Sequence, residues 1–363
     1  MPDERYEWLC SAHSLVPPPS TAPHASLASR LAPALPDLWK PPSQYPAYLH
    51  VTDIAGLVRG AASGAGLGNA FLSHIQAVDG VFHVVRAFDN DDVVHVDDSV
   101  DPVRDLETIQ HELCCKDLEY AERQEAEEKK DVKKSPNMKL SALFIATFER
   151  VLAMLREDKP VKGGSWNSAE VELIRAKLPD LITTKPVVYL VNLNREDFLR
   201  KKNKWLPKIH AWVTAHGGGV MIPFSVEHEQ ALFAARDDPD ALAALTDVER
   251  GGARSALPKV ITQGYKELAL IYYFTAGEKE VRCWTVQQGA LAPEAAGVIH
   301  TDFQRGFIKA EVVSFADFKE HSTGPSMADV KAAGRYRIEG KQYEVKDADI
   351  IHFQFNVTTS GKK

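Results

Sequence analysis

The chain has 363 residues, of which 44% are hydrophobic, so it is long enough to form two or three domains with separate cores. Its formal net charge of -7 argues against a protein that coats nucleic acid, and DNA is not an expected partner. With no apolar run as long as a membrane span, no secretory signal and four cysteines without metal or disulfide spacing, we expect no membrane partner and a cytoplasmic location.

Residues 14–39 form a low-complexity segment rich in Pro, Ala, Ser and Leu. Nine of the 21 prolines of the chain fall between Pro17 and Pro46. Proline lacks an amide donor and restricts the residue before it, so we expect neither a regular helix nor a central strand here. The segment is interpreted either as a disordered insertion or as a translated intron.

The motif D-x-x-G follows at Asp53 and Gly56, after an expected strand at residues 48–51. In nucleoside triphosphatases the aspartate of this motif holds Mg²⁺, usually through water, and the glycine amide approaches the γ-phosphate. Four further glycines between residues 57 and 68 would let the backbone take two conformations. A four-residue motif is common, so a plain strand-end turn is the alternative.

Leu57 occupies the place where many GTPases carry a glutamine that orients the attacking water. Because leucine cannot hydrogen-bond to water, hydrolysis would need another group and intrinsic turnover should be slow. Leu57 could equally serve as a buried anchor of the switch.

After an expected strand at residues 81–85, the pattern becomes charged and helical from residue 104 to residue 179. It contains a break at Ser135 and Pro136, and a second amphipathic run begins at Leu143. An antiparallel helical hairpin inserted in an α/β domain is the economical interpretation.

A continuous apolar run at residues 187–191 predicts a buried parallel strand that ends at Asn192. Ligands bind beyond the carboxyl ends of such strands. The tetrapeptide from Asn192 to Arg195 therefore corresponds to the N-K-x-D motif that recognises guanine, but Arg195 replaces the carboxylate. A guanidinium cannot accept guanine's N–H groups, so adenine is the better prediction. The alternative for Asn192 is an ordinary turn residue.

Two features follow this motif. The basic segment, residues 200–208, contains five Lys or Arg side chains and Trp205; it is interpreted as a solvated helix face or as a surface that docks on ribosomal RNA. A further apolar run at residues 220–224 leads to Ser225, which resembles the last base-contacting loop of nucleoside triphosphatases. Short strands are then expected at residues 281–286, 343–345 and 350–353.

Three blocks of the sequence, DIAGLVRGAASGAGLGNAFLSHIQAVDGVFHVVRAF, KPVVYLVNLNREDFLRKKNKWLPKI and YYFTAGEKEVRCWTVQQGALAPEAAGVIHTDFQRGFIKAEV, closely resemble the Obg-like ATPase (YchF) family of P-loop NTPases. The resemblance begins at MPDERYEWLC and resumes from about residue 45 to residue 355. If residues 14–39 were removed, the flanking residues 10–13 and 40–43 would join into a plausible family segment. This favours the interpretation of residues 14–39 as a translated intron.

The resemblance implies an α/β fold: an incomplete P-loop NTPase parallel sheet with an inserted helical hairpin and a C-terminal β-grasp TGS domain. The expected divisions are residues 1–103 and 180–265 for the NTPase domain, 104–179 for the hairpin and 269–355 for the TGS domain. It also implies ATP hydrolysis with Mg²⁺, and the ribosome as a partner in translation and stress control. Asp53, Gly56 and Leu57 would take part in hydrolysis, Asp53 would hold Mg²⁺, and Asn192, Leu193 and Ser225 would contact the nucleotide.

One departure from the family pattern concerns the phosphate loop, G-x-x-x-x-G-K-[ST], which no part of the 363 residues matches. The nearest approach ends at Gly340, Lys341 and Gln342, has one residue too many between its glycines, and is interpreted as a chance match. We therefore expect the start at Met1 to reflect a fragment or an erroneous gene model, and the chain as it stands to be inactive. A non-catalytic interaction module and a GTP-preferring enzyme are the alternatives.

Overall fold

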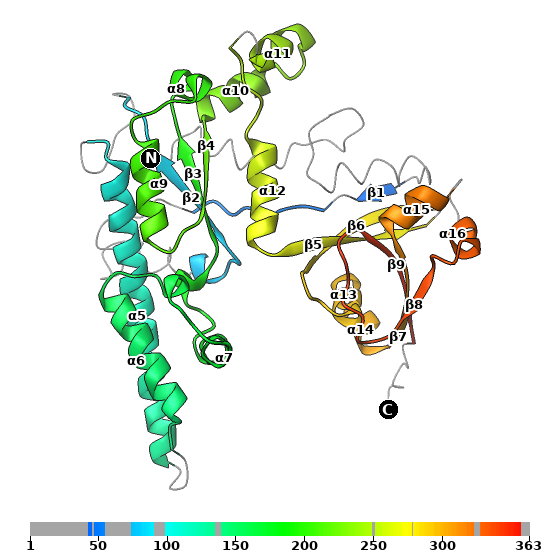
Figure 1. The fold of residues 1–363 in the computed structure, drawn as a ribbon, viewed down its shortest axis with the longest axis horizontal. Helices are drawn as coiled ribbons and strands as arrows, with labels where there is room; N and C mark the ends of the chain where they lie inside the picture. The colour runs from blue at the N-terminus through cyan, green and yellow to red at the C-terminus, as the bar shows by residue number, and fades with distance from the viewer. Residues whose placement is uncertain are drawn as a thin grey trace, which may run out of the picture. The chain divides into compact units, whose positions relative to one another are not determined.

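The computed structural model describes residues 43–45, 47–54, 74–90, 99–134, 139–248, 251–277, 279–322 and 327–356. These residues divide into two compact units, which Figure 1 shows as ribbons. Unit 1 comprises the described residues from Val51 to Ala256. Unit 2 comprises those up to His50 and those from Leu257 onward. The expected fold class, a mixed α/β protein with a parallel sheet and a C-terminal domain of β-strands, is confirmed.

Unit 1 is built on a three-stranded parallel sheet in the order β2-β3-β4. Its strands are β2 Val81–Arg86, β3 Val187–Asn192 and β4 Val220–Phe224. The central strand β3 has the sequence VVYLVN, and its four middle side chains are buried, as its run of apolar residues predicts. Because the strands are parallel, their carboxyl ends meet at one edge of the sheet.

The helices of unit 1 include a long pair that lies side by side in Figure 1. Phe148 of this pair is fully buried in a core cluster that both helices supply. The pair is antiparallel, since Arg156 pairs with Glu122 of the first helix while Asp158, farther along the chain, pairs with the earlier residue His111. The helices are α5 Pro102–Lys134, α6 Ala142–Arg156, α7 Ser168–Lys177, α8 Arg195–Arg200, α9 Leu206–Ala215, α10 Val226–Ala234 and α11 Pro239–Thr246, with 3₁₀ turns η1 Val161–Gly163 and η2 Ile182–Thr184.

Unit 2 has a six-stranded mixed sheet in the order β1-β6-β5-β9-β7-β8. Neighbouring residues of β5 point to opposite faces, so Phe274 and Tyr273 each centre a different core cluster. The strands are β1 Ser43–Tyr45, β5 Leu270–Ala276, β6 Glu280–Gln287, β7 Phe307–Ser314, β8 Arg337–Glu339 and β9 Asp349–Phe355. The helices are α12 Leu257–Glu267, α13 Ala292–Ile299, α14 Thr301–Arg305, α15 Phe315–His321 and α16 Ala328–Ala332.

Two of the strands expected from the sequence do not form. Residues 48–51 lie in coil, with Tyr48 61% and Val51 42% exposed, because no strand of the described sheet pairs with them. Residues 343–345 contribute only a single bridge, from Leu291 to Glu344. Both strand predictions are therefore wrong. Among the described helices, none is long and apolar enough to cross a membrane.

Candidate functional site

Asn192 connects the carboxyl ends of all three strands of unit 1. Its main-chain oxygen accepts a hydrogen bond from the nitrogen of Ala87, 2.9 Å away, just beyond β2. Its side-chain Oδ1 accepts one from the nitrogen of Val226, 3.2 Å away, where α10 begins after β4. The nitrogen of Leu193 donates to the oxygen of Phe224 at 2.9 Å. The loops after β2, β3 and β4 are thus one hydrogen-bonded edge.

The side chains of Leu193 and Ser225 are turned into the protein at this edge, being 2% and 0% exposed. Leu193 packs in the core cluster that contains Ile209. Ser225 is the N-cap of α10, and its Oγ accepts a hydrogen bond from the nitrogen of His228 at 3.4 Å. The Nδ2 of Asn192, by contrast, has no hydrogen-bond partner among the described residues, so this amide is the polar group that the edge leaves available.

Arg195 is held at the first position of the short helix α8. Asn194 caps that helix, because its side chain accepts a hydrogen bond from the nitrogen of Asp197 at 2.7 Å. The nitrogen of Arg195 donates to Oε2 of Glu227 at 3.2 Å. The Nε of Arg195 is buried and has no hydrogen-bond partner within the described part of the chain. Leaving such a donor unsatisfied costs about 1–3 kcal/mol.

The residues of the D-x-x-G motif are only partly described. Asp53 lies in exposed coil, and no hydrogen bond between described residues connects it to Asn192. Desolvation of its covered part raises the pKa of Asp53, while a hydrogen bond from the main chain of Ile54 lowers it. Gly56 and Leu57 lie outside the described residues. The structure therefore brings together Asn192, Leu193 and Ser225 but does not add Asp53 to them.

Comparisons with known proteins agree over nearly the whole chain. A family model described as "YchF-GTPase_C: Protein of unknown function (DUF933)" matches residues 270–356. Obg-like ATPase 1 of Oryza sativa subsp. indica is 50% identical over 363 residues, which are 100% of this chain and 83% of that protein. Obg-like ATPase 1 of Caenorhabditis elegans is 49% identical over 319 residues, 88% of this chain and 78% of that protein. The chain belongs to the Obg-like ATPase (YchF) family.

A solved structure of the Obg-like ATPase family has the same fold. The "Structure of the Schizosaccharomyces pombe YchF GTPase" matches with a TM-score of 0.78 and 38% sequence identity, covering 98% of this chain and 96% of that one. The resemblance inferred from the sequence blocks is thereby confirmed, and the family as a whole is one of nucleotide-binding P-loop NTPases.

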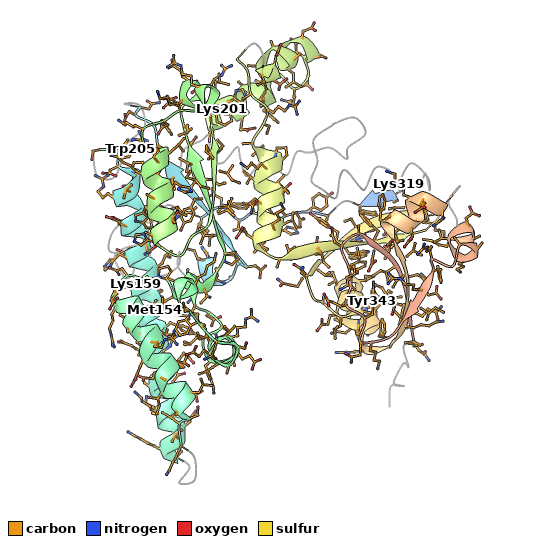
Figure 2. All side chains as sticks on the ribbon, viewed as in Figure 1. Met154, Lys159, Lys201, Trp205, Lys319 and Tyr343 are labelled. Atoms are coloured by element: carbon orange, nitrogen blue, oxygen red, sulfur yellow. The ribbon has the colours of Figure 1, made fainter. Side chains whose placement is uncertain are left out.

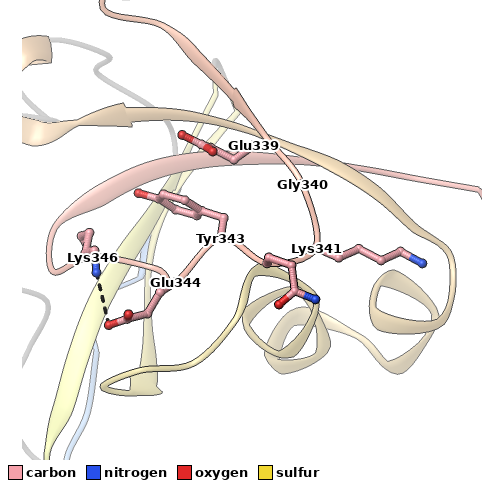
Figure 3. Close-up of a pocket in the computed structure, with 7 residues that line it drawn as sticks. Glu339, Gly340, Lys341, Tyr343, Glu344 and Lys346 are labelled. Atoms are coloured by element: carbon pink, nitrogen blue, oxygen red, sulfur yellow. Dashed lines mark ion pairs between the residues drawn. The ribbon is translucent and has the colours of Figure 1, made fainter.

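A hollow of about 430 Å³ lies in unit 2, around the turn after β8 (Figure 3). Lys346 Nζ and Glu344 Oε1 form an ion pair of 3.2 Å at its wall. The turn contains Gly340 and Lys341, the nearest sequence match to a phosphate loop. A phosphate loop places its amides at the N-terminus of a helix, whereas this segment is a turn after a strand. The geometry of this turn therefore agrees with the interpretation of the sequence match as a chance one.

Sequence reasoning missed the bonds that hold the candidate site together. Asn192 and Val226 are 34 positions apart, and Arg195 and Glu227 are 32 apart, so no local pattern predicts either contact. One signal was present: Asn194 followed three residues later by an acidic residue is the start pattern of a helix.

Proposed function

We propose that this chain is the nucleotide-binding body of an Obg-like ATPase and that the edge formed by Asn192, Leu193 and Ser225 receives the base. The hydrogen bonds that fix the three strand ends, and leave Nδ2 of Asn192 without a described partner, support this proposal. An amide donor in that position suits a ring nitrogen of a purine, which is an acceptor. The proposed activity is ATP hydrolysis coupled to ribosome function and stress control.

Base preference is proposed to depend on Arg195. Guanine presents N–H donors, which a carboxylate in this place would accept and a guanidinium cannot. The N–H donors of a guanidinium suit the ring nitrogens of adenine, which are acceptors. The Oryza relative is called an ATPase and the Schizosaccharomyces protein a GTPase, so the preference has to be tested on this chain. We infer ATP over GTP, with a GTP-preferring enzyme as the alternative.

Hydrolysis is assigned to the D-x-x-G segment. Asp53 would hold Mg²⁺ through water, a role that fits an exposed carboxylate. Gly56 would let the main chain approach the γ-phosphate without a Cβ in the way. Leu57 would leave the orientation of water to another group. Mg²⁺ bound with ATP neutralises charge on the phosphates.

Nucleotide binding tests the proposal directly. The 363 residues contain no phosphate loop, so we expect them to bind Mg·ATP weakly, since each charge-assisted hydrogen bond to phosphate that cannot form costs about 1.5–3 kcal/mol. A chimera carrying the phosphate-loop segment of a family member should prefer ATP to GTP by about tenfold, or 1.4 kcal/mol, in competition calorimetry. Arg195→Glu should reduce that preference. Arg200→Glu, in the same helix but exposed and paired with Glu196, is the matched control.

The results of these experiments distinguish the proposed role in nucleotide binding from the proposed role in hydrolysis. An ATP dissociation constant below about 1 μM for the 363-residue chain, or a chimera that prefers GTP tenfold, would contradict the proposal. Asp53→Ala in the chimera should slow phosphate release at saturating ATP while base affinity is kept. Unchanged turnover in that variant would reduce the D-x-x-G motif to a structural turn.

Ribosome binding is a second proposed function, and the basic segment supports it. Lys201, Lys202 and Lys208 are exposed and pair with no carboxylate among the described residues. Figure 2 labels Lys201 and Trp205 within this segment. The Nζ atoms of Lys204 and Lys208 lie 5.4 and 4.8 Å from the ring centre of Trp205. The segment therefore offers ammonium groups to RNA phosphates rather than an open aromatic face for base stacking.

Sedimentation with ribosomes at two salt concentrations tests this function. The double variant Lys201→Ala/Lys202→Ala should bind more weakly and with a salt slope that is smaller by about 2, because two fewer phosphates are neutralised. Lys139→Ala/Lys162→Ala, which removes two exposed lysines elsewhere in unit 1, is the control. Equal behaviour of the two double variants would reject the basic segment as the docking surface.

A further inference from the structure

Three side chains of unit 1 lie in line on the surface where α5 meets the end of α6. His111 and Cys115 are four residues apart on α5 and so share one face of the helix. The Sγ of Cys115 lies 3.5 Å from Nε2 of His111. The other ring nitrogen, Nδ1, lies 2.8 Å from Oδ1 of Asp158. Nucleophile, base and orienting carboxylate follow one another in the order that activates a thiol.

Asp158 is held in place by its main chain. It follows α6 in the left-handed conformation, with φ 55°, which aspartate adopts more readily than most residues. Its nitrogen donates to the oxygen of Leu155 at 3.2 Å, and its oxygen accepts from Nε2 of Gln110 at 2.5 Å. The nitrogen of Lys159 then bonds to the oxygen of Met154 at 3.0 Å. Figure 2 labels Met154 and Lys159 on either side of this turn, beside α5.

The hydrogen bonds determine the tautomer of His111. The carboxylate of Asp158 only accepts, so Nδ1 carries a hydrogen, and the neutral ring leaves Nε2 as an acceptor for the thiol hydrogen. The two ring nitrogens point to opposite sides, so these three side chains do not converge on one point as metal ligands would. No group of three such side chains in the described part of the chain is arranged to hold a metal.

Small reagents can reach this arrangement. The side chains of His111 and Asp158 are 57% and 50% exposed, and Cys115 is half-buried. Cys114 and Cys283 are buried, and burial raises the pKa of each thiol to about 12. Among the described cysteines, Cys115 alone combines access with a neighbouring base.

We propose that Cys115 is a modification site, where the thiol passes its proton to Nε2 of His111 and attacks a small disulfide of the glutathione-disulfide type. Sγ forms a bond to one sulfur of the reagent while the S–S bond breaks. The second sulfur leaves as a thiolate and takes the proton from His111. The products are a mixed disulfide on Cys115 and one small thiol, so atoms and electrons balance.

The acidic groups around Cys115 determine the pH range in which its reaction depends on His111. Burial raises the pKa of Cys115, and the charges of Asp158 and Glu112 raise it further, so little free thiolate exists at neutral pH. Proton transfer to His111 avoids this cost, because the imidazolium then lies between the thiolate and the carboxylate of Asp158. At alkaline pH the thiol ionises without help and the base is no longer needed.

The test uses the full chain, reduced and then incubated with glutathione disulfide from about pH 6 to about pH 10.5, so that the upper end lies well above the ordinary pKa of a thiol. Tandem mass spectrometry distinguishes an adduct on Cys115 from one on Cys114. At about pH 7, His111→Ala should slow the formation of the adduct on Cys115 roughly tenfold, which is a small effect for a positioned base. The rates of the wild-type protein and the variant should converge as the pH rises. His210→Ala, an exposed histidine on α9, is the matched control.

Three results would overturn the proposal. The first is equal rates for the wild-type protein and His111→Ala at neutral pH. The second is a slowing in His111→Ala by the same factor at every pH, which would indicate a merely structural effect. The third is an adduct on Cys114 with none on Cys115.

Discussion

At the scale of single residues, Asn192 combines structural and binding roles. Its main-chain oxygen and its Oδ1 bind the segments that follow β2 and β4, while its Nδ2 donors are left for a ligand. An amide can do both because it carries an acceptor and two donors on one rigid plane. The same side chain therefore shapes the edge and would read the base.

Asn192→Ala should lower the free energy of unfolding by about 1–3 kcal/mol, because the nitrogen of Val226, which is 5% exposed, loses its acceptor. Asn192→Asp should cost less, since a carboxylate still accepts and is favourable at the start of α10. Urea unfolding of the three proteins measures both effects. If Asn192→Asp were as damaging as Asn192→Ala, the hydrogen bond to Val226 would not be the cause.

The sequence identified Asn192 and Ser225 because each directly follows an apolar run that forms a strand. It could not predict that Leu193 and Ser225 would have buried side chains, since burial depends on α9 and α10 packing against that edge. The proposed nucleotide roles of Asn192, Leu193, Ser225 and Asp53 remain predictions. Those of Gly56 and Leu57 concern residues outside the described ones.

At the scale of elements, Asp117 connects α5 by hydrogen bonds to the segment that leads into the sheet. Its carboxylate oxygens accept hydrogen bonds from the nitrogens of Ile182 at 2.8 Å and Thr183 at 2.7 Å, at the turn η2 that precedes β3. Asp117 is fully buried, and this burial raises its pKa from 3.8 to about 6, although the bonds from Thr183 and Ile182 oppose the shift.

A raised pKa in the folded state means that Asp117 favours folding when protonated. Its contribution should be fully present below about pH 4 and be lost as the pH rises through about 6. The free energy of unfolding of the wild-type protein relative to Asp117→Asn should fall by roughly 3 kcal/mol across that window. Asp240→Asn, an exposed position on α11, is the control. If denaturant titrations showed that the stability of the wild-type protein relative to Asp117→Asn rises with pH, the raised pKa of Asp117 would be contradicted.

Elements defined by their own apolar pattern could be predicted from the sequence. The run at residues 187–191 became β3, the run at residues 220–224 became β4, and the two amphipathic runs became α5 and α6. Residues 48–51 carry a strand-like pattern but have no neighbouring strand to pair with. Residues 343–345 form coil with one bridge at Glu344, and the Tyr343 hydroxyl donates to Asp349 Oδ2 at 2.6 Å.

At the scale of the whole molecule, two units with separate cores account for the described residues. Family membership explains the α/β order of unit 1 and the sheet of unit 2, and the resemblance predicted both. No local pattern predicts that β1 joins the sheet of unit 2, because its pairing runs from Ser43 to Glu280. The domain boundaries expected at residues 103, 179 and 265 stay predictions.

The pairing of β1 with β6 determines when the sheet of unit 2 can be completed during synthesis. The residues of β1 leave the ribosome before any described residue of unit 1, and their partner strand β6 follows only after unit 1 is complete. At roughly 5–20 residues per second, β1 waits on the order of 10–50 seconds for its partner. Unit 1 can fold during that interval, whereas the sheet of unit 2 gains its edge strand β1 only after β6 has been made.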